Sequence, residues 1–534
     1  MKINDLIRYA NRILLLIAFM LIGYRAGDTS MGIYFSIGII SMSIFFWLVG
    51  GVKKTTARLI RVQKKKMSGS GGEKILKMGL AVSVALTGLY LLVTLVLGGK
   101  LSELFLGTYV GDMIFAAFGF LLLLYGVNGC FKGYYQGEND QLIIYISDLI
   151  NGLLFVILVA VFIKRFITYG EKAALLLHEP IIMNAYSAFG AVILQCVALL
   201  VADVYLVAVY ISQVNGHKRG ASAFKGGEYN DNLRRRMIIG SFAVTLERAF
   251  PATALAAFII AYMHFGIRHA DSIKTLFINN GVIASKVITV ILVPLYLFNE
   301  YMNREGRKLV VDYEHQDEKN FRIRVNLMLK NALFILIPVM LTVFFLRTPI
   351  VKIFFDGKMS LGIKLLSKAA VIILIGGLSI SYKTILKAFN MNRIILTGSV
   401  IASVSGLAYT CIACHKTAVP SIVIWAMVIY YATDMLVMAY FVHSSLKVNM
   451  YDLLIKAVKC IVAGAAASIV AVIIDKIFVM NIIHFVITIA IITGVYMSIV
   501  VLLHGIKSRD INSLKGTVTY YPAFFFKNLL DRKF

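Results

Sequence analysis

The stretch Met78–Gly98 reads MGLAVSVALTGLYLLVTLVLG and carries no charged side chain over 21 residues. An α-helix rises about 1.5 Å per residue, so about 20 apolar residues cross the hydrocarbon core of a bilayer. This stretch therefore predicts a transmembrane helix, which we place at residues 75–98.

Thirteen further apolar runs of similar length follow the same pattern, each bounded by charged residues, Gly or Pro. They lie at residues 6–25, 31–52, 112–130, 141–163, 181–211, 237–262, 277–300, 325–346, 365–386, 394–414, 420–443, 455–474 and 481–504. The first run is not followed by a small-residue cleavage site, so we expect a retained helix instead of a signal peptide. The sequence predicts an all-α polytopic membrane protein with about 14 transmembrane helices.

The composition agrees with this fold class and excludes others. Of 534 residues, 59% are hydrophobic and 15% are charged, and the mean hydropathy is +0.82. A soluble chain has about 45–50% apolar and about 25% charged residues, so a soluble enzyme, a fibre and a disordered chain are excluded. The five cysteines lie within or at the ends of apolar runs, which suggests no disulfide framework. Since the loops are short, we expect no appended catalytic or nucleotide-binding domain.

The basic residues predict the orientation of the chain. An even number of spans places both termini on one side, and the loops of that side hold 38 of the 54 Lys and Arg residues, against 14 in the opposite loops. Cytoplasmic loops carry an excess of Lys and Arg. Both termini are therefore expected in the cytoplasm. The net charge of +27 collects in these loops, so we expect no nucleic-acid partner.

Two segments suggest an internal repeat. Phe131–Gly137 (FKGYYQG) follows the fourth run and Leu386–Asn390 (LKAFN) follows the tenth, and each combines a hydrophobic residue, a Lys and an aromatic residue. Long basic loops follow the second and eighth runs. These offsets predict two six-helix lobes, residues 1–230 and 231–450. Residues 451–534 would then add two helices and a cytoplasmic amphipathic tail.

Several motifs resemble a known transporter superfamily. Gly27–Tyr34 (GDTSMGIY) and the later Gly50–Ile60 (GGVKKTTARLI) resemble the start of the stage V sporulation protein B and polysaccharide-exporter branch of the multidrug/oligosaccharidyl-lipid/polysaccharide (MOP) exporter superfamily. Phe131–Gly137 is similar to a turn found in that branch and in MurJ-type lipid II flippases. Pro338 and Pro349–Gly357 (PIVKIFFDG) also fit the pattern.

The resemblance implies two six-helix lobes around a central cavity, alternating access, and a lipid-linked sugar as cargo. We therefore expect a flippase or exporter of a lipid-linked oligosaccharide or a cell-wall or polysaccharide precursor. The implied partners are a polyprenyl-diphosphate-linked sugar, anionic membrane lipids and the cell-wall or polysaccharide synthesis machinery. The implied location is the cytoplasmic membrane.

Three basic residues within or at the ends of spans are candidate substrate ligands: Arg25, Arg248 and Lys286. A charge inside a membrane is costly, so it normally faces a cavity or a partner. Diphosphate needs cationic donors, and the planar guanidinium can bind two phosphate oxygens. The alternative is that Arg248 pairs with an acid while the other two reach an interface.

Four acidic residues in the spans could couple transport to an ion or pair structurally: Asp148, Asp203, Glu247 and Asp434. Asp148 and Asp434 lie near cytoplasmic ends, which favours pairing for these two. The structural partner considered for Arg248 is Asp203 or Glu247.

The segment Phe131–Gly137 is expected to form a cytoplasmic turn. Gly133 and Gly137 would permit a tight reversal, Lys132 would suit the headgroup layer, and Gln136 could cap a helix end. Gating or headgroup contact is the functional alternative. The basic run at residues 53–66 is expected to bind anionic lipid, with capture of substrate as its alternative.

No cofactor and no metal site is expected. Cys411–His415 (CIACH) matches the C-x-x-C-H haem-attachment pattern, but it lies at the end of an apolar run, where we interpret it as a coincidence. A membrane-embedded transferase would need a His or Asp pair at one face, and the histidines of the outer loops are scattered. Two rivals remain: a cation-coupled exporter of drugs or metabolites with the same fold, and a scaffold that does not transport.

Overall fold

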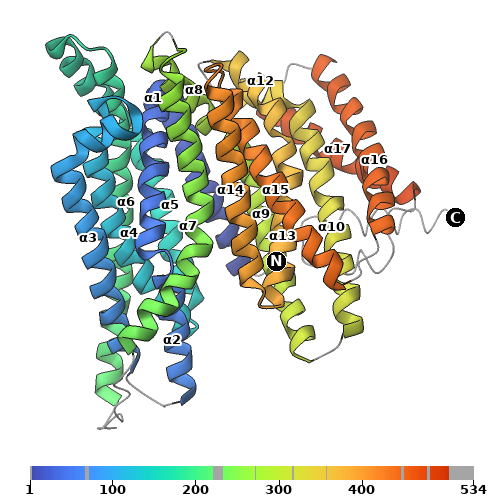
Figure 1. Cartoon of the computed structure of the whole chain (residues 1–534), viewed down its shortest axis with the longest axis horizontal. Helices are drawn as coiled ribbons and strands as arrows, with labels where there is room; N and C mark the ends of the chain where they lie inside the picture. The colour runs from blue at the N-terminus through green and yellow to red at the C-terminus, as the bar shows by residue number, and fades with distance from the viewer. Residues whose placement is uncertain are drawn as a thin grey trace. The chain divides into compact units, whose positions relative to one another are not determined.

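The computed structural model describes residues 3–66, 71–220, 233–270, 272–315, 318–355, 358–446, 450–477 and 481–503 (Figure 1). Within these ranges every regular element is a helix. The helices are α1 (Ile3–Val49), α2 (Val52–Lys66), α3 (Gly71–Leu106), α4 (Asp112–Glu138), α5 (Gln141–Leu177), α6 (Ile181–Gly220), α7 (Leu233–Gly266), α8 (Ile273–Val282), α9 (Thr289–Glu314), α10 (Glu318–Phe345), α11 (Arg347–Phe354), α12 (Met359–Ala369), α13 (Val371–Ala388), α14 (Asn392–Cys414), α15 (Ser421–Leu446), α16 (Met450–Ile477) and α17 (Ile482–Leu502), with short 3-10 (η1, Tyr109–Gly111) and π (η2, Ile283–Ile288) segments.

Thirteen helical stretches of the described residues are long and apolar enough to cross a membrane. The first, Tyr9–Lys64, has 56 residues and contains two of the spans predicted from the sequence. This explains the difference from the 14 predicted spans. The prediction of an all-α, multi-pass membrane protein is confirmed.

The two predicted spans within α1 meet at Gly27. This residue has φ of 85° and ψ of 164°, which is outside the helical region although helix continues on both sides. Such a conformation is open almost only to glycine, because it has no Cβ atom. A side chain at this position would therefore strain the break between the two spans.

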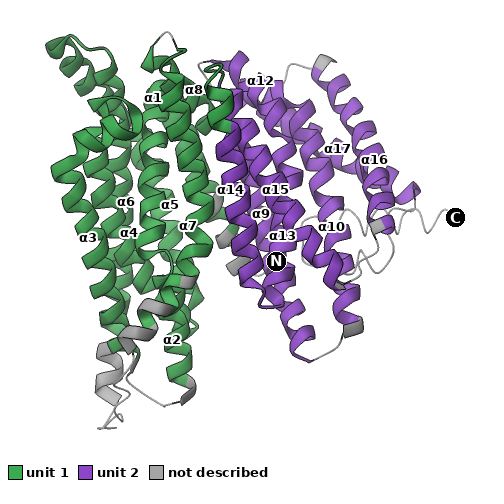
Figure 2. Cartoon of the chain, viewed as in Figure 1, with its two compact units in different colours: residues 1–285, 410–419 green, residues 286–409, 420–534 purple. Residues whose placement is uncertain are grey.

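The chain divides into two compact units (Figure 2). Unit 1 contains residues 1–285 and 410–419, and unit 2 contains residues 286–409 and 420–534. The units are defined by contacts within the chain, whereas the lobes predicted above are defined by counting spans. The lobe boundaries at 230 and 450 therefore stay a prediction, and the predicted tail lies outside the described residues.

In unit 1, α1 and α8 touch through their backbones. A Cβ atom on Gly32 would lie 1.8 Å from the carbonyl oxygen of Phe277, and one on Gly281 would lie 1.7 Å from that of Asp28. Small residues permit such a close approach between membrane helices. Any larger residue at either glycine would push the two helices apart.

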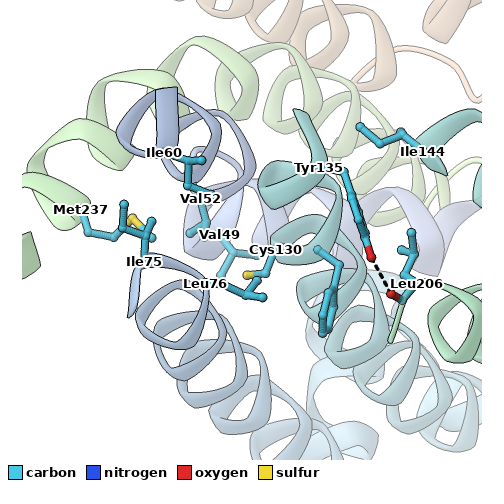
Figure 3. Packing of buried hydrophobic residues seen from close by; sticks show 11 residues of the cluster. Val49, Val52, Ile60, Ile75, Leu76, Cys130, Tyr135, Ile144, Leu206 and Met237 are labelled. Atoms are coloured by element: carbon cyan, nitrogen blue, oxygen red, sulfur yellow. Dashed lines mark hydrogen bonds between the residues drawn. The ribbon is translucent and has the colours of Figure 1, made fainter. Parts of the chain in front are cut away.

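A hydrophobic cluster packs α2 against α3 and α4 in unit 1 (Figure 3). Val52 and Ile60 of α2 pack there with Ile75 of α3 and Cys130 of α4. The hydroxyl of Tyr135, also in this cluster, donates to the carbonyl oxygen of Leu206 at 2.9 Å. Short helix α2 is therefore docked onto the bundle by an apolar face.

The predicted turn at Lys132–Gly137 is wrong, because α4 runs on to Glu138. The chain reverses after it, at Asn139, whose φ is 78°. Gly133 and Gly137 serve packing instead: an added Cβ would lie 2.6 Å from the carbonyl oxygen of Lys53 and 2.7 Å from Cβ of Ile60, respectively. These two glycines, one helical turn apart, let α2 lie directly against α4.

In unit 2, α13 packs against α9, α10 and α15, while α10 and α16 pack together. The span predicted at 365–386 is divided between α12 and α13 at Ala370. Helix α13 ends at Ala388, and Asn390 has a φ of 57°. The second predicted turn, at Leu386–Asn390, therefore lies at the end of a helix, unlike the first.

Candidate functional site

Unit 1 holds an ion pair between α4 and α5. Nζ of Lys132 lies 2.6 Å from Oδ1 of Asp148. The Lys132 residue is 7% exposed, whereas the Asp148 side chain is 39% exposed. A lysine this deep in a membrane helix needs a partner, and Asp148 provides the structural pairing that the sequence analysis favoured for it.

Asp203 lies on α6 and is buried, with 6% exposure. Its Oδ1 accepts a hydrogen bond from Nδ2 of Asn128 at 2.5 Å. Its Oδ2 is also buried and has no hydrogen-bond partner among the described residues. Within the described residues, therefore, only one of the two carboxylate oxygens of the buried Asp203 has a hydrogen-bond partner, and that partner lies on α4.

Neutral polar residues extend this cluster along α6. Two turns before Asp203, Oε1 of Gln195 accepts from the hydroxyl of Tyr34 at 2.6 Å, and its Nε2 donates to the hydroxyl of Tyr125 at 3.0 Å. Sequence reasoning missed these residues, because it searched the spans for ionisable side chains only. Gln195 lies eight residues before Asp203 on the same helix, and this spacing was the available signal.

Unit 2 holds a second buried carboxylate. Asp434 of α15 is 0% exposed, and its Oδ2 lies 2.7 Å from Nζ of Lys383 on α13. The hydroxyl of Ser379 donates to Oδ2, and that of Ser399 on α14 donates to Oδ1 at 3.3 Å. Lys383 was not among the predicted site residues, although it lies within the span predicted at 365–386.

The two clusters share the spacing of their donors along one helix, although the donors bind two aspartates in unit 1 and one in unit 2. Asn128 and Lys132 are four residues apart on α4, and Ser379 and Lys383 are four residues apart on α13, so each pair shares a helix face. In both units the first residue donates to an aspartate of another helix. The sequence comparison aligned Lys132 with Lys387, but by contacts its counterpart is Lys383, one turn earlier.

Arg248 on α7 contacts the bend between α1 and α2. Its Nη1 donates to the carbonyl oxygen of Gly50 at 3.1 Å, and the backbone N–H of Gly51 donates to Oγ1 of Thr245 at 3.0 Å. Arg248 is exposed in the described chain. The partner observed for its guanidinium is thus a backbone carbonyl, whereas the sequence analysis considered Asp203 or Glu247.

Glu247 lies next to Arg248 and approaches α2. One of its carboxylate oxygens is 4.0 Å from Nζ of Lys54, at the limit of an ion pair. Because the Lys54 side chain is 58% exposed, this contact adds little to stability. Glu247 is therefore placed at the same junction of α7 with α2 as Arg248.

Within unit 1, the structure does not bring Arg25 and Arg248 together. Arg25 is an exposed residue of α1 that precedes the break at Gly27. About 33 Å of helix lies between that break and Gly50, where Arg248 binds. Lys286 belongs to unit 2 and is 1% exposed, within the π-helical segment Ile283–Ile288. Short π-helical segments within α-helices are frequent at functional sites. Substrate binding by these residues stays a prediction.

Two basic residues of α2 contact the end of α4. Arg61 donates through Nε and Nη2 to the carbonyl oxygen of Gln136, and Nζ of Lys64 lies 2.9 Å from Oε2 of Glu138. Cations are favourable at a helix C-terminus, where carbonyl groups are left unpaired. Part of the basic run thus holds α2 on α4, and its binding to anionic lipid stays a prediction.

Comparisons with known proteins rest on structure alone, since no protein-family model and no curated protein sequence matches the chain. A solved structure of the lipid II flippase MurJ superposes with a TM-score of 0.63 at 15% identity, covering 94% of this chain and 99% of that one. The chain has the fold of MATE and MurJ transporters. A multidrug resistance MATE family transporter of the MOP superfamily matches with a TM-score of 0.62 at 12% identity, over 82% of this chain and 95% of its own.

Proposed function

We propose that the protein is a flippase that moves a lipid-linked oligosaccharide or a cell-wall or polysaccharide precursor across the cytoplasmic membrane by alternating access. The observation that carries this proposal is the extent of the shared fold. The superposition on the lipid II flippase covers 94% of this chain, compared with 82% for the MATE transporter. The arrangement of helices in a known flippase therefore accounts for nearly the whole chain.

An anionic cargo is supported by the charge of the chain. It carries twice as many basic as acidic residues, for a net charge of +27. Lys286 is buried within an irregular helical segment, and ionisable residues inside membrane helices often mark substrate or ion pathways. We propose that Arg25, Arg248 and Lys286 serve the diphosphate of a polyprenyl-linked sugar.

We also propose an orientation in the membrane, a lipid contact and a functional partner for the protein. The excess of basic residues in one set of loops supports a cytoplasmic position for both termini. The basic helix α2 supports contact with anionic lipids. A cargo of this class would make the cell-wall or polysaccharide synthesis machinery the functional partner.

A cation-coupled exporter is the second candidate, and one observation favours it. Asp203 and Asp434 are both buried acids in the interior of their units, and Asp203 has a carboxylate oxygen without a hydrogen bond among the described residues. Buried acids of this kind are used in proton and ion relays. The MATE transporter of similar fold is named for multidrug resistance.

Reconstitution into proteoliposomes separates the two candidates. A fluorescent polyprenyl-diphosphate oligosaccharide, initially on both leaflets, is tested for accessibility to an external quencher, and a cationic dye is tested for uptake driven by a sodium or proton gradient. We expect flipping of the lipid-linked sugar above the rate of empty vesicles. Gradient-driven movement of the dye without flipping would replace the first proposal with the second.

A further inference from the structure

A pocket of about 260 Å³ lies inside unit 2, between α9 and α13. On α9 its lining includes Asn299, Asn303 and Arg307, spaced by four residues, and on α13 it includes Lys383 and Lys387, also spaced by four. Residues four apart share one face of a helix. Two polar stripes therefore face each other across the pocket.

The lining is strongly basic. Of the ten residues around the pocket, three are Lys or Arg and none is Asp or Glu. Like charges four residues apart on a helix repel by about 0.2–0.5 kcal/mol, so Lys383 and Lys387 do not stabilise α13 by themselves. This arrangement favours an anion in the pocket.

An ion pair with Asp434 holds Lys383 in position at the pocket. Its Nζ lies 2.7 Å from the fully buried Asp434, and its side chain remains 21% exposed. An ammonium group has three N–H donors, so one can bind Asp434 while the others remain for a ligand. Arg307 and Lys387 are exposed and can adjust to an incoming group.

The size of the pocket restricts the ligand. Sites for drug-sized molecules measure about 300–1,000 Å³, so about 260 Å³ suits a small headgroup fragment better than a whole glycan. Three cations and two amide side chains match several negatively charged oxygens. Arginine adds the ability to bind two phosphate oxygens at once. The net positive charge of the lining disfavours a positively charged drug.

We propose that the α9/α13 pocket binds the diphosphate group of the lipid-linked cargo, as a site separate from Arg25, Arg248 and Lys286. This inference rests on the proposed function for the identity of the lipid. The pocket lies toward the C-terminal end of α9 and overlaps the basic segment at residues 304–330, which the excess of Lys and Arg predicts to be cytoplasmic. It would therefore receive the headgroup before the headgroup crosses the membrane.

Binding of inorganic pyrophosphate to the purified full-length protein tests the pocket. We expect Arg307→Gln and Lys387→Gln each to weaken binding by about tenfold, because each removes a charge-assisted hydrogen bond. Arg307→Lys keeps the charge but loses the planar fork, and should weaken binding less than Arg307→Gln. Gel filtration shows that each variant remains folded.

The matched control is Arg393→Gln, which removes an exposed arginine of α14 that does not line the pocket. Unchanged affinity in Arg307→Gln, or an equal loss in Arg393→Gln, would overturn the proposed site. Competition then identifies the source of the diphosphate: farnesyl diphosphate, a short polyprenyl diphosphate, should displace pyrophosphate. Failure to compete would assign the pocket to a soluble anion and overturn its role in holding cargo.

The flipping assay keeps the two proposals distinct. If the protein flips lipid-linked sugars and pyrophosphate does not bind, the pocket proposal fails and the proposed function stands. If pyrophosphate binds through Arg307 and Lys387 but no lipid-linked sugar is flipped, the site stands as an anion site and the proposed function fails.

Discussion

Asn128 and Lys132 lie one helical turn apart on α4, yet they bind two different aspartates. Asn128 donates to Asp203 on α6, and Lys132 forms an ion pair with Asp148 on α5. One face of α4 thus connects three helices of unit 1 through polar contacts. Unit 2 uses a residue pair of the same spacing, Ser379 and Lys383, on a single aspartate.

Removal of the Lys132 ammonium should destabilise unit 1. Lys132→Met leaves the carboxylate of Asp148 without its cation, and we expect a loss of about 1–2 kcal/mol because that carboxylate is partly exposed. Thermal unfolding of the purified protein measures the loss. The double variant Lys132→Met/Asp148→Asn should recover most of it, and a double variant no more stable than Lys132→Met would argue against this pairing.

The packing of α2 on α4 should depend on Gly137. An alanine there places Cβ 2.7 Å from Cβ of Ile60, so Gly137→Ala should lower the melting temperature. Gly129→Ala is the matched control on the same helix, since an added Cβ at Gly129 has no atom within 4 Å. The control should be neutral or should stabilise by up to about 1 kcal/mol through helix propensity. Equal effects at the two positions would refute close packing at Gly137.

Arg248 should be needed for transport more than for folding. Arg248→Ala loses one hydrogen bond to the Gly50 carbonyl, worth about 1.5–3 kcal/mol, and we expect it to abolish flipping while the protein still inserts. Arg248→Lys should keep partial activity. Thr245→Val, which removes the neighbouring hydrogen bond to Gly51 without changing charge, should keep flipping. If both variants lose flipping equally, Arg248 acts by holding the bend.

The topology can be tested with reporters in the loops. A reporter fused after Lys66, Lys225 or Phe534 should report the cytoplasm, and one inserted after His178, between α5 and α6, should report the outside. The reason is the concentration of Lys and Arg in the first set of loops. Reversed signals at two of these sites would contradict the predicted orientation.

The transmembrane spans could be predicted from the sequence because a span is a local property. Whether 20 residues can cross a bilayer depends on their own polarity and length, so runs such as 78–98 needed no knowledge of their neighbours. The break at Gly27 was also signalled locally, by charge and glycine between two apolar runs. The resemblance to MOP transporters added the fold.

The partners of the polar residues were decided by tertiary structure. A helix places a side chain on a face, but which helix meets that face depends on how the bundle packs. For this reason Gly133 and Gly137 were predicted to form a turn, although they are packing positions. For the same reason Lys387, and not Lys383, was taken as the counterpart of Lys132. Likewise, the backbone carbonyl that binds Arg248 has no signature in the sequence, because every residue carries one.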